Sequence, residues 1–151
     1  MTTTINTNIN SAPSLPCAAE KLISHRGPML LIDDLLERQH GHAAASATLN
    51  EDNICIARNF GVLPEYFIEL LAQTVAAASG YDHLIAEAPP GAGFLVGVDN
   101  FSCENFTPSR QQNFITRILT TMEAGAMKIV HGEVFAGEIS VATAELKLWL
   151  E

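Results

Sequence analysis

Residues 64–87 constrain the fold of this chain more than any other segment. They open with Pro64 and Glu65, a proline suited to the first turn of a helix and an acid beside its positive end. From residue 66 to residue 78 nearly all side chains are apolar, on every side of a helix. A helix that is hydrophobic all round is buried all round. The sequence therefore predicts one long helix that other elements enclose.

The sequence after this helix predicts an enclosing sheet. Residues 93–103, 112–124, 127–137 and 139–151 are β-branched, partly alternating runs separated by Gly, Pro and Ser. Only antiparallel strands are connected by turns this short. We therefore expect three or four antiparallel strands in the C-terminal part of the chain.

The sequence before the helix adds a hairpin. Residues 29–38 and 42–50 favour two strands, with His40-Gly41 near the turn, and residues 17–25 favour a short helix. A strand pair, one buried helix and further strands follow one another along the chain. This order predicts an α+β fold in which an antiparallel sheet wraps a central helix.

The composition indicates one domain with a partner. A chain of 151 residues, 48% of them hydrophobic, can bury a core without metal or disulfides. It has no internal repeat and no linker, so we expect a single domain over residues 17–151 after a flexible leader, residues 1–16. The mean hydropathy of +0.18 is high for a soluble monomer, which indicates that another subunit covers apolar surface.

Charge and cysteine content limit the partners and the compartment. Eight Lys and Arg against 17 Asp and Glu give a net charge of −9, and this excludes nonspecific binding to nucleic acid. Cys17, Cys55 and Cys103 are odd in number and widely spaced, as expected of reduced thiols rather than of a disulfide or zinc framework. The chain shows no signal peptide and no apolar run of membrane-spanning length. We therefore expect a cytoplasmic protein without membrane insertion.

Glu69 is the informative polar residue of the predicted helix. Gln73 follows it four residues later, so both side chains lie on one face. A carboxylate in an otherwise apolar helix either has a partner or has a raised pKa, and a raised carboxyl pKa suits a general acid or base. The alternative is a structural role for Glu69, at a dimer edge or paired with an arginine such as Arg58 or Arg110.

The histidines do not predict a metal site. None of the five has the spacing of a metal-ligand set, since His40 and His42 flank a glycine in the predicted turn. We therefore expect neither a metal nor a cofactor. His25 precedes the Gly27-Pro28 turn, where a histidine more often fixes a loop than reacts, so a supporting role is expected for it.

Glycines 91, 93 and 97 do not predict a phosphate-binding loop, because they lead into a strand and such a loop needs a following helix. Gly97, inside the predicted strand, instead marks a place where a ligand or another backbone passes closely. No GxSxG motif occurs, which excludes a serine hydrolase of that kind.

Three segments carry a resemblance to a known family: SHRGPMLLIDDLLE, IELLAQTVAAASG and FLVGVDNFSCENFTPS. In this order and at these separations they resemble the (3R)-hydroxyacyl-acyl-carrier-protein dehydratases of the hotdog fold. The resemblance runs from about Leu22 to the C-terminus. It is strongest for the divergent branch associated with aryl-polyene-type lipid gene clusters, in which a Pro-led segment like LPEYFIELLAQ opens the helix.

The resemblance implies a dimer with sheets joined edge to edge and a site built from two protomers. One protomer supplies a histidine from a His-Phe-Pro-Gly loop and the other an acid from the helix. The acid matches Glu69, followed by Ala72-Gln73, but the position fourteen residues earlier is Cys55 and the segment around it has no histidine. Glu69 would then act with a water, with Cys55 or with a histidine from elsewhere.

From this resemblance we expect a 3-hydroxyacyl-thioester dehydratase, or a dehydratase-like subunit, of fatty-acid or polyene-type lipid biosynthesis. Its partners would be acyl carrier protein or a coenzyme A thioester, and a second copy or a paralogue in a dimer. The expected site has Glu69 as the catalytic residue; Gln73, Cys55 and His25 as supporting residues; and Phe94, Gly97 and Val98 as the lining of an acyl tunnel.

Three other functions fit the same residues. Some hotdog thioesterases use a helix carboxylate and no histidine, so Glu69 could serve thioester hydrolysis. The chain could also be a non-catalytic subunit that completes a heterodimeric dehydratase, or a non-enzymatic acyl-binding protein. Acyl carrier protein is itself acidic, so docking on a chain of net charge −9 would depend on local basic residues such as Arg58, Arg110 and Arg117.

Overall fold

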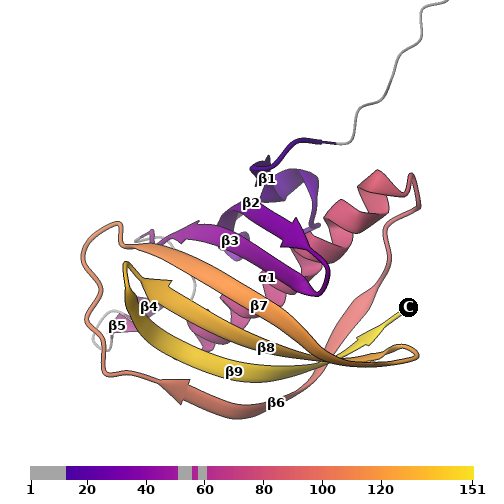
Figure 1. Cartoon of the computed structure of the whole chain (residues 1–151). Helices are drawn as coiled ribbons and strands as arrows, with labels where there is room; N and C mark the ends of the chain where they lie inside the picture. The colour runs from indigo at the N-terminus through magenta and orange to yellow at the C-terminus, as the bar shows by residue number, and fades with distance from the viewer. Residues whose placement is uncertain (1–12, 51–55, 58–60) are drawn as a thin grey trace, which may run out of the picture.

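A seven-stranded antiparallel sheet forms one layer of the protein, and a single long helix lies against one of its faces (Figure 1). The computed structural model describes residues 13–50, 56–57 and 61–151. The strand order is β1-β2-β3-β7-β8-β9-β6. These strands are β1 (Cys17–Ala18), β2 (Ile32–Gln39), β3 (His42–Thr48), β6 (Gly93–Cys103), β7 (Asn113–Ala124), β8 (Met127–Ala136) and β9 (Ile139–Leu150).

The predicted hairpin is confirmed, and of the three or four strands expected in the C-terminal part, four are present. Strands β2 and β3 turn back at His40-Gly41, as the sequence indicated. Gly125 and Gly137 form the next two turns with φ values of 61° each, a conformation that glycine adopts without strain. Two further short strands, β4 (Ile56–Ala57) and β5 (Gly61–Val62), pair with each other just before the helix.

The N-terminal segment differs from its prediction. In place of a short helix over residues 17–25, the structure has β1 and one 3-10 turn, η1 (Ala19–Lys21). Cys17 pairs with Leu35 of β2, so the backbone hydrogen bonds go to the sheet. An isolated helix of this length is marginal in water, and the open edge of β2 offers the better partner. A second 3-10 turn, η2 (Gly27–Met29), follows.

The long helix predicted over residues 64–87 is confirmed as α1 (Glu65–Ile85), which packs mainly on β2, β3, β7 and β8. Gly132 of β8 lies under the helix, where a Cβ would come within 2.8 Å of the Leu71 side chain. The helix therefore approaches the sheet closely at this point. Its buried side chains are Tyr66, Phe67, Leu70, Leu71, Gln73, Thr74, Val75, Ala77 and Ala78.

The helix is not buried all round within one chain, contrary to the expectation. Ile68, Glu69, Ala72 and Ala76 are only half-buried. Their spacing places them on one side of the helix, away from the sheet. The reason is that one sheet encloses one side of the helix, and residues 22–31, which contact it at Gly80 and Gln73, cover the rest incompletely. An apolar stripe that contains Glu69 thus stays accessible.

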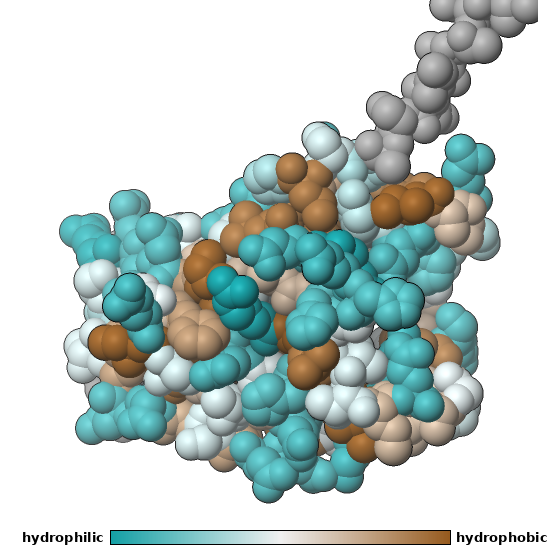
Figure 2. All heavy atoms as spheres, in the orientation of Figure 1, coloured by the Kyte–Doolittle hydropathy of each residue, from teal (hydrophilic) through white to brown (hydrophobic). Residues whose placement is uncertain are grey.

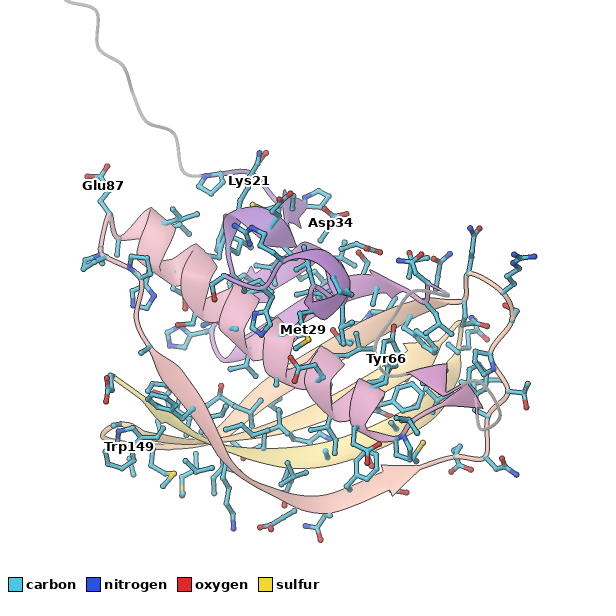
Figure 3. The ribbon with its side chains drawn as sticks, turned by 180° about the vertical axis from the view of Figure 1, so that it is seen from behind. Lys21, Met29, Asp34, Tyr66, Glu87 and Trp149 are labelled. Carbon is cyan, nitrogen blue, oxygen red and sulfur yellow. The ribbon has the colours of Figure 1, made fainter. Side chains whose placement is uncertain are left out.

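Strand β6 is an edge of the sheet, because its one strand partner in the described chain is β9. Phe94, Leu95 and Val96 on this strand are 55%, 42% and 56% exposed. Trp149 of β9, labelled in Figure 3, pairs in register with Phe94 and is also exposed. Figure 2 views the face of the sheet turned away from the helix, where hydrophobic residues lie among hydrophilic ones.

Candidate functional site

Gln73 joins the helix to the loop that precedes β2. Its side chain is almost fully buried, with 1% exposed. The amide nitrogen Nε2 donates to the carbonyl oxygen of Met29 at 2.7 Å, and the amide oxygen accepts from the backbone N–H groups of Leu31 at 2.9 Å and Ile32 at 3.4 Å. These backbone partners determine which end of the amide is oxygen. Figure 3 shows Met29 beside the helix.

The second hydrogen bond of the Gln73 amide nitrogen holds Glu69. Nε2 donates to Glu69 Oε1 at 2.9 Å, across the one helical turn that the sequence predicted. Because Gln73 is fixed by backbone groups, this contact fixes the position of one carboxylate oxygen. The Glu69 side chain is 33% exposed, so the carboxylate is oriented by the protein and still open to a ligand.

His25 faces the same carboxylate oxygen from the loop. Its Nε2 lies 3.5 Å from Glu69 Oε1, and its side chain is also 33% exposed. Its other ring nitrogen, Nδ1, is buried without a hydrogen-bond partner among the described residues. In the part of the chain that the structure describes, Gln73 and His25 are the polar side chains in contact with Glu69. The structure thus brings three of the sequence-predicted residues together.

A close backbone contact positions the loop that carries His25. The carbonyl oxygen of Leu22 packs directly on Gly80 of α1, where any Cβ would overlap it. Arg26 Nη1 donates to the carbonyl oxygens of Ile23 and His25, each at 2.7 Å. Residues 22–31 are therefore anchored on the helix at two levels, by Gly80 and by Gln73.

Aromatic rings support the helix turn before Glu69. Tyr66 and Phe67 pack edge to face at 5.5 Å between ring centroids, and both lie within 6 Å of the Phe114 ring. Aromatic pairs in this geometry add to the stabilisation from burial. Neither this cluster nor the backbone groups that fix Gln73 were predicted, because main-chain contacts leave no pattern of residue types.

Among the described residues, the predicted tunnel residues Phe94, Gly97 and Val98 do not join Glu69 in this chain. Cys55 and the alternative partner Arg58 lie outside the described residues. Phe94 and Gly97 lie on the outer face of β6, in register with Trp149 and Lys147, while Val98 lies on the inner face in register with Leu146. The acyl tunnel remains a prediction, and of its three residues Val98 alone faces the helix side of the sheet.

Two further features concern ligands and membranes. Within residues 13–50, 56–57 and 61–151, no group of three or more His, Cys, Asp or Glu side chains is arranged to hold a metal ion. In the same part of the chain, α1 is too polar, and no other helix is long enough, to qualify as a membrane span. At the site itself, the described side chains offer a carboxylate, an imidazole and an amide.

The family comparison covers nearly the whole described fold. A family model named ApeP-like, which describes the ApeP dehydratase, matches residues 17–150. Among curated proteins, no sequence matches significantly.

Comparison with solved structures establishes the hotdog fold. The dehydratase heterocomplex ApeI:P from Xenorhabdus doucetiae matches with a TM-score of 0.79 and 17% identity, over 92% of this chain and 93% of that one. The smu.793 protein from Streptococcus mutans UA159, bound to acetyl CoA, matches with a TM-score of 0.61 and 11% identity, over 85% of this chain and 91% of that one. A hypothetical thioesterase protein with coenzyme A from Streptococcus pneumoniae TIGR4 matches with a TM-score of 0.58 and 8% identity, over 78% of this chain and 84% of that one. The fold class expected from the resemblance is confirmed.

Proposed function

The chain belongs to the ApeP-like dehydratase family, and from this we propose that it dehydrates a 3-hydroxyacyl thioester with Glu69 as the acid–base residue. The observation that carries the proposal is the Glu69 carboxylate itself. It stands on an accessible stripe of an otherwise buried helix and is held by the fully buried Gln73. A fixed but accessible carboxylate suits proton transfer to a bound substrate.

The reaction needs one group that takes a proton from the carbon next to the thioester and one that protonates the leaving hydroxyl. Glu69 Oε1 is engaged by Gln73, and the side chain stays one third exposed, so the carboxylate is accessible to a substrate. Because the Gln73 amide is fixed, the carboxylate does not need to reorganise when the substrate binds, and such preorganisation lowers the barrier. Gln73 is thus the residue that orients the acid.

The chain works as one subunit of a dimer in this proposal. The apolar side chains at the edge of β6 and the half-buried stripe of α1 are both incompletely covered by the described residues. An exposed edge strand with large apolar residues invites pairing with another sheet. The ApeI:P structure is a heterocomplex, which makes a paralogue as plausible a partner as a second copy.

The carrier is acyl carrier protein in the first instance, with a coenzyme A thioester as the substitute for assay. Two structural neighbours were solved with acetyl CoA or coenzyme A, which supports thioester recognition on this fold. The net charge of −9 disfavours docking of an acidic carrier except through local basic residues. Both carriers therefore belong in the test.

The test measures formation of the enoyl thioester by the purified chain, alone and with a dehydratase paralogue from the same organism. Glu69→Gln should lower the rate by about 10²–10⁴-fold. Glu65→Gln is the matched control, because Glu65 is exposed on the same helix one turn earlier and should leave the rate unchanged.

Each other product identifies a different function. Free thiol without enoyl product would replace the dehydratase with a thioesterase. Enoyl product that forms only with the paralogue, and is lost with Glu69→Gln, would assign the chain as the acid-bearing subunit of a heterodimeric dehydratase. Enoyl product that is unaffected by Glu69→Gln would contradict the role of Glu69.

A further inference from the structure

We propose that His25 of the same chain is the proton-exchange partner of Glu69, in place of a histidine from a partner's loop. This inference rests on the proposed dehydratase function. The observation behind it is the approach of His25 Nε2 to Glu69 Oε1, at 3.5 Å within one chain. The site would then have both of its proton-carrying groups in a single protomer.

The burial of the imidazole defines which nitrogen is available. Nδ1 is buried and has no partner within the described residues, so it cannot exchange a proton with a ligand. Nε2 lies on the accessible side, against the carboxylate. Both side chains are one third exposed, so a substrate that reaches Glu69 also reaches His25.

The loop that carries His25 is fixed in position, as is expected of a segment that bears a reactive side chain. The contact of Leu22 with Gly80 and the hydrogen bond from Gln73 to the Met29 carbonyl fix it on both sides of His25. Gln73 thereby orients Glu69 directly and His25 through the backbone. One buried amide sets the geometry of the pair, as expected of a supporting residue in a preorganised site.

The other histidines of the chain lie elsewhere. His40 and His42 flank the turn between β2 and β3, and His131 is exposed on β8 in register with Glu145. His83 is on α1 but fourteen residues after Glu69, about 21 Å along the helix axis. His25 is therefore the one histidine of this sequence that the fold places at Glu69.

His25 and Glu69 need only one proton between them, shared by His25 Nε2 and Glu69 Oε1, to carry out the dehydration. The deprotonated member takes the α-proton of the substrate, and the electron pair of that C–H bond becomes the new C=C bond. The C–O bond breaks as the protonated member gives its proton to the hydroxyl, which leaves as water. The proton gained from carbon then passes between His25 and Glu69 and restores the pair, so no other reactant is needed.

The kinetic test uses His25→Gln, because glutamine keeps an N–H donor near Glu69 but cannot exchange a proton. The rate should fall by about 10²–10⁴-fold, and the pH profile of kcat/KM should lose one limb. A merely structural role would leave the shape of the profile unchanged. His40→Gln, an exposed histidine on the hairpin turn, is the matched control and should behave as wild type.

A complementation test separates one-chain sites from shared sites. His25→Gln and Glu69→Gln chains are co-expressed with different tags, and dimers that carry both tags are purified. If each site takes both groups from one chain, these dimers are inactive. If the groups come from different chains, one of the two sites is intact and about half of the wild-type activity returns, which would overturn the inference.

Failure of the inference differs from failure of the proposed function. If wild type forms no enoyl thioester, alone or with the paralogue, the function and the inference both fall. If wild type is active and Glu69→Gln is not, but His25→Gln keeps full rate and both limbs of the pH profile, the function stands and the inference is wrong. Where activity needs the paralogue, the same His25→Gln comparison is made in that complex.

Discussion

Two acidic residues on α1, Glu69 and Asp82, have opposite surroundings. Asp82 binds the guanidinium of Arg38 in two contacts of 3.0 and 2.6 Å, and Arg38 also donates to the carbonyl oxygens of Gln39 and His42. Glu69 has one well-made hydrogen bond, from Gln73, and a histidine at 3.5 Å with an unsatisfied nitrogen.

The difference separates a structural acid from a reactive one. At the C-terminal end of the helix, both oxygens of the carboxylate are used to tie the helix to the β2-β3 hairpin. Nearer the N-terminal end, the His25 loop and the helix hold the Glu69 carboxylate but leave part of its hydrogen-bonding capacity free for a ligand or water. Beside it, His25 Nδ1 is a buried polar atom without a hydrogen-bond partner among the described residues, and such atoms in native structures call for an explanation. The contrast yields predictions that separate activity from stability.

The largest expected effect is on activity at Glu69. Glu69→Gln should lower dehydration by about 10²–10⁴-fold while the free energy of unfolding changes by less than about 1 kcal/mol, because the amide can still accept from Gln73. Enzyme assay and urea unfolding measure the two quantities. A large loss of stability with little loss of activity would make Glu69 a structural acid like Asp82.

Gln73→Leu should affect both quantities. The leucine fits the volume but leaves the N–H groups of Leu31 and Ile32 and the carbonyl of Met29 without their partner. Unsatisfied buried groups cost about 1–3 kcal/mol each, so the loss of three partners should lower the unfolding free energy by at least about 3 kcal/mol. Gln73→Glu retains the acceptor for Leu31 and Ile32 but sets a buried carboxylate oxygen against Glu69 Oε1 and the Met29 carbonyl, so it should lower both stability and activity.

Gly80→Ala tests how the His25 loop is placed. The new Cβ would overlap the carbonyl oxygen of Leu22, so the loop must move away from the helix. We expect a loss of about 1–3 kcal/mol in stability and a lower kcat, because His25 moves with the loop. Ser79→Ala, at the neighbouring half-buried position, is the control; equal effects of both variants would contradict a specific role for Gly80.

The fold was predictable from the sequence because its signals are local. Alternation, β-branched runs and turn glycines indicated the hairpin and the four C-terminal strands, and the apolar stretch after Pro64 indicated the helix. The segment at residues 17–25 was predicted wrongly because its hydrogen bonds go to β2, a tertiary contact. The accessible stripe on the helix was missed for a similar reason, since apolarity alone does not show how far a sheet extends around a helix.

Of the candidate site, only the contact set by helical spacing was predictable from the sequence. The four-residue interval placed Glu69 next to Gln73, and this contact is present. The approach of His25 depends on the Leu22–Gly80 contact and on the bond from Gln73 to Met29, which is 44 residues away in sequence. No periodicity indicates such contacts, so His25 was assigned a supporting role without a partner.

Asp82→Asn should give the smallest effect and completes the comparison. The variant removes the charge of the two-contact ion pair, but the Asp82 side chain is 48% exposed, and exposed pairs contribute about 0.2–1 kcal/mol. Stability should fall by about that amount at low salt and by less at high salt, because ions screen exposed pairs. Activity should stay at the wild-type level. Glu123→Gln, which breaks the single-contact pair with Lys128, is the control and should have a still smaller effect. A loss of dehydration in Asp82→Asn would show that the two ends of α1 are coupled rather than divided between structure and chemistry.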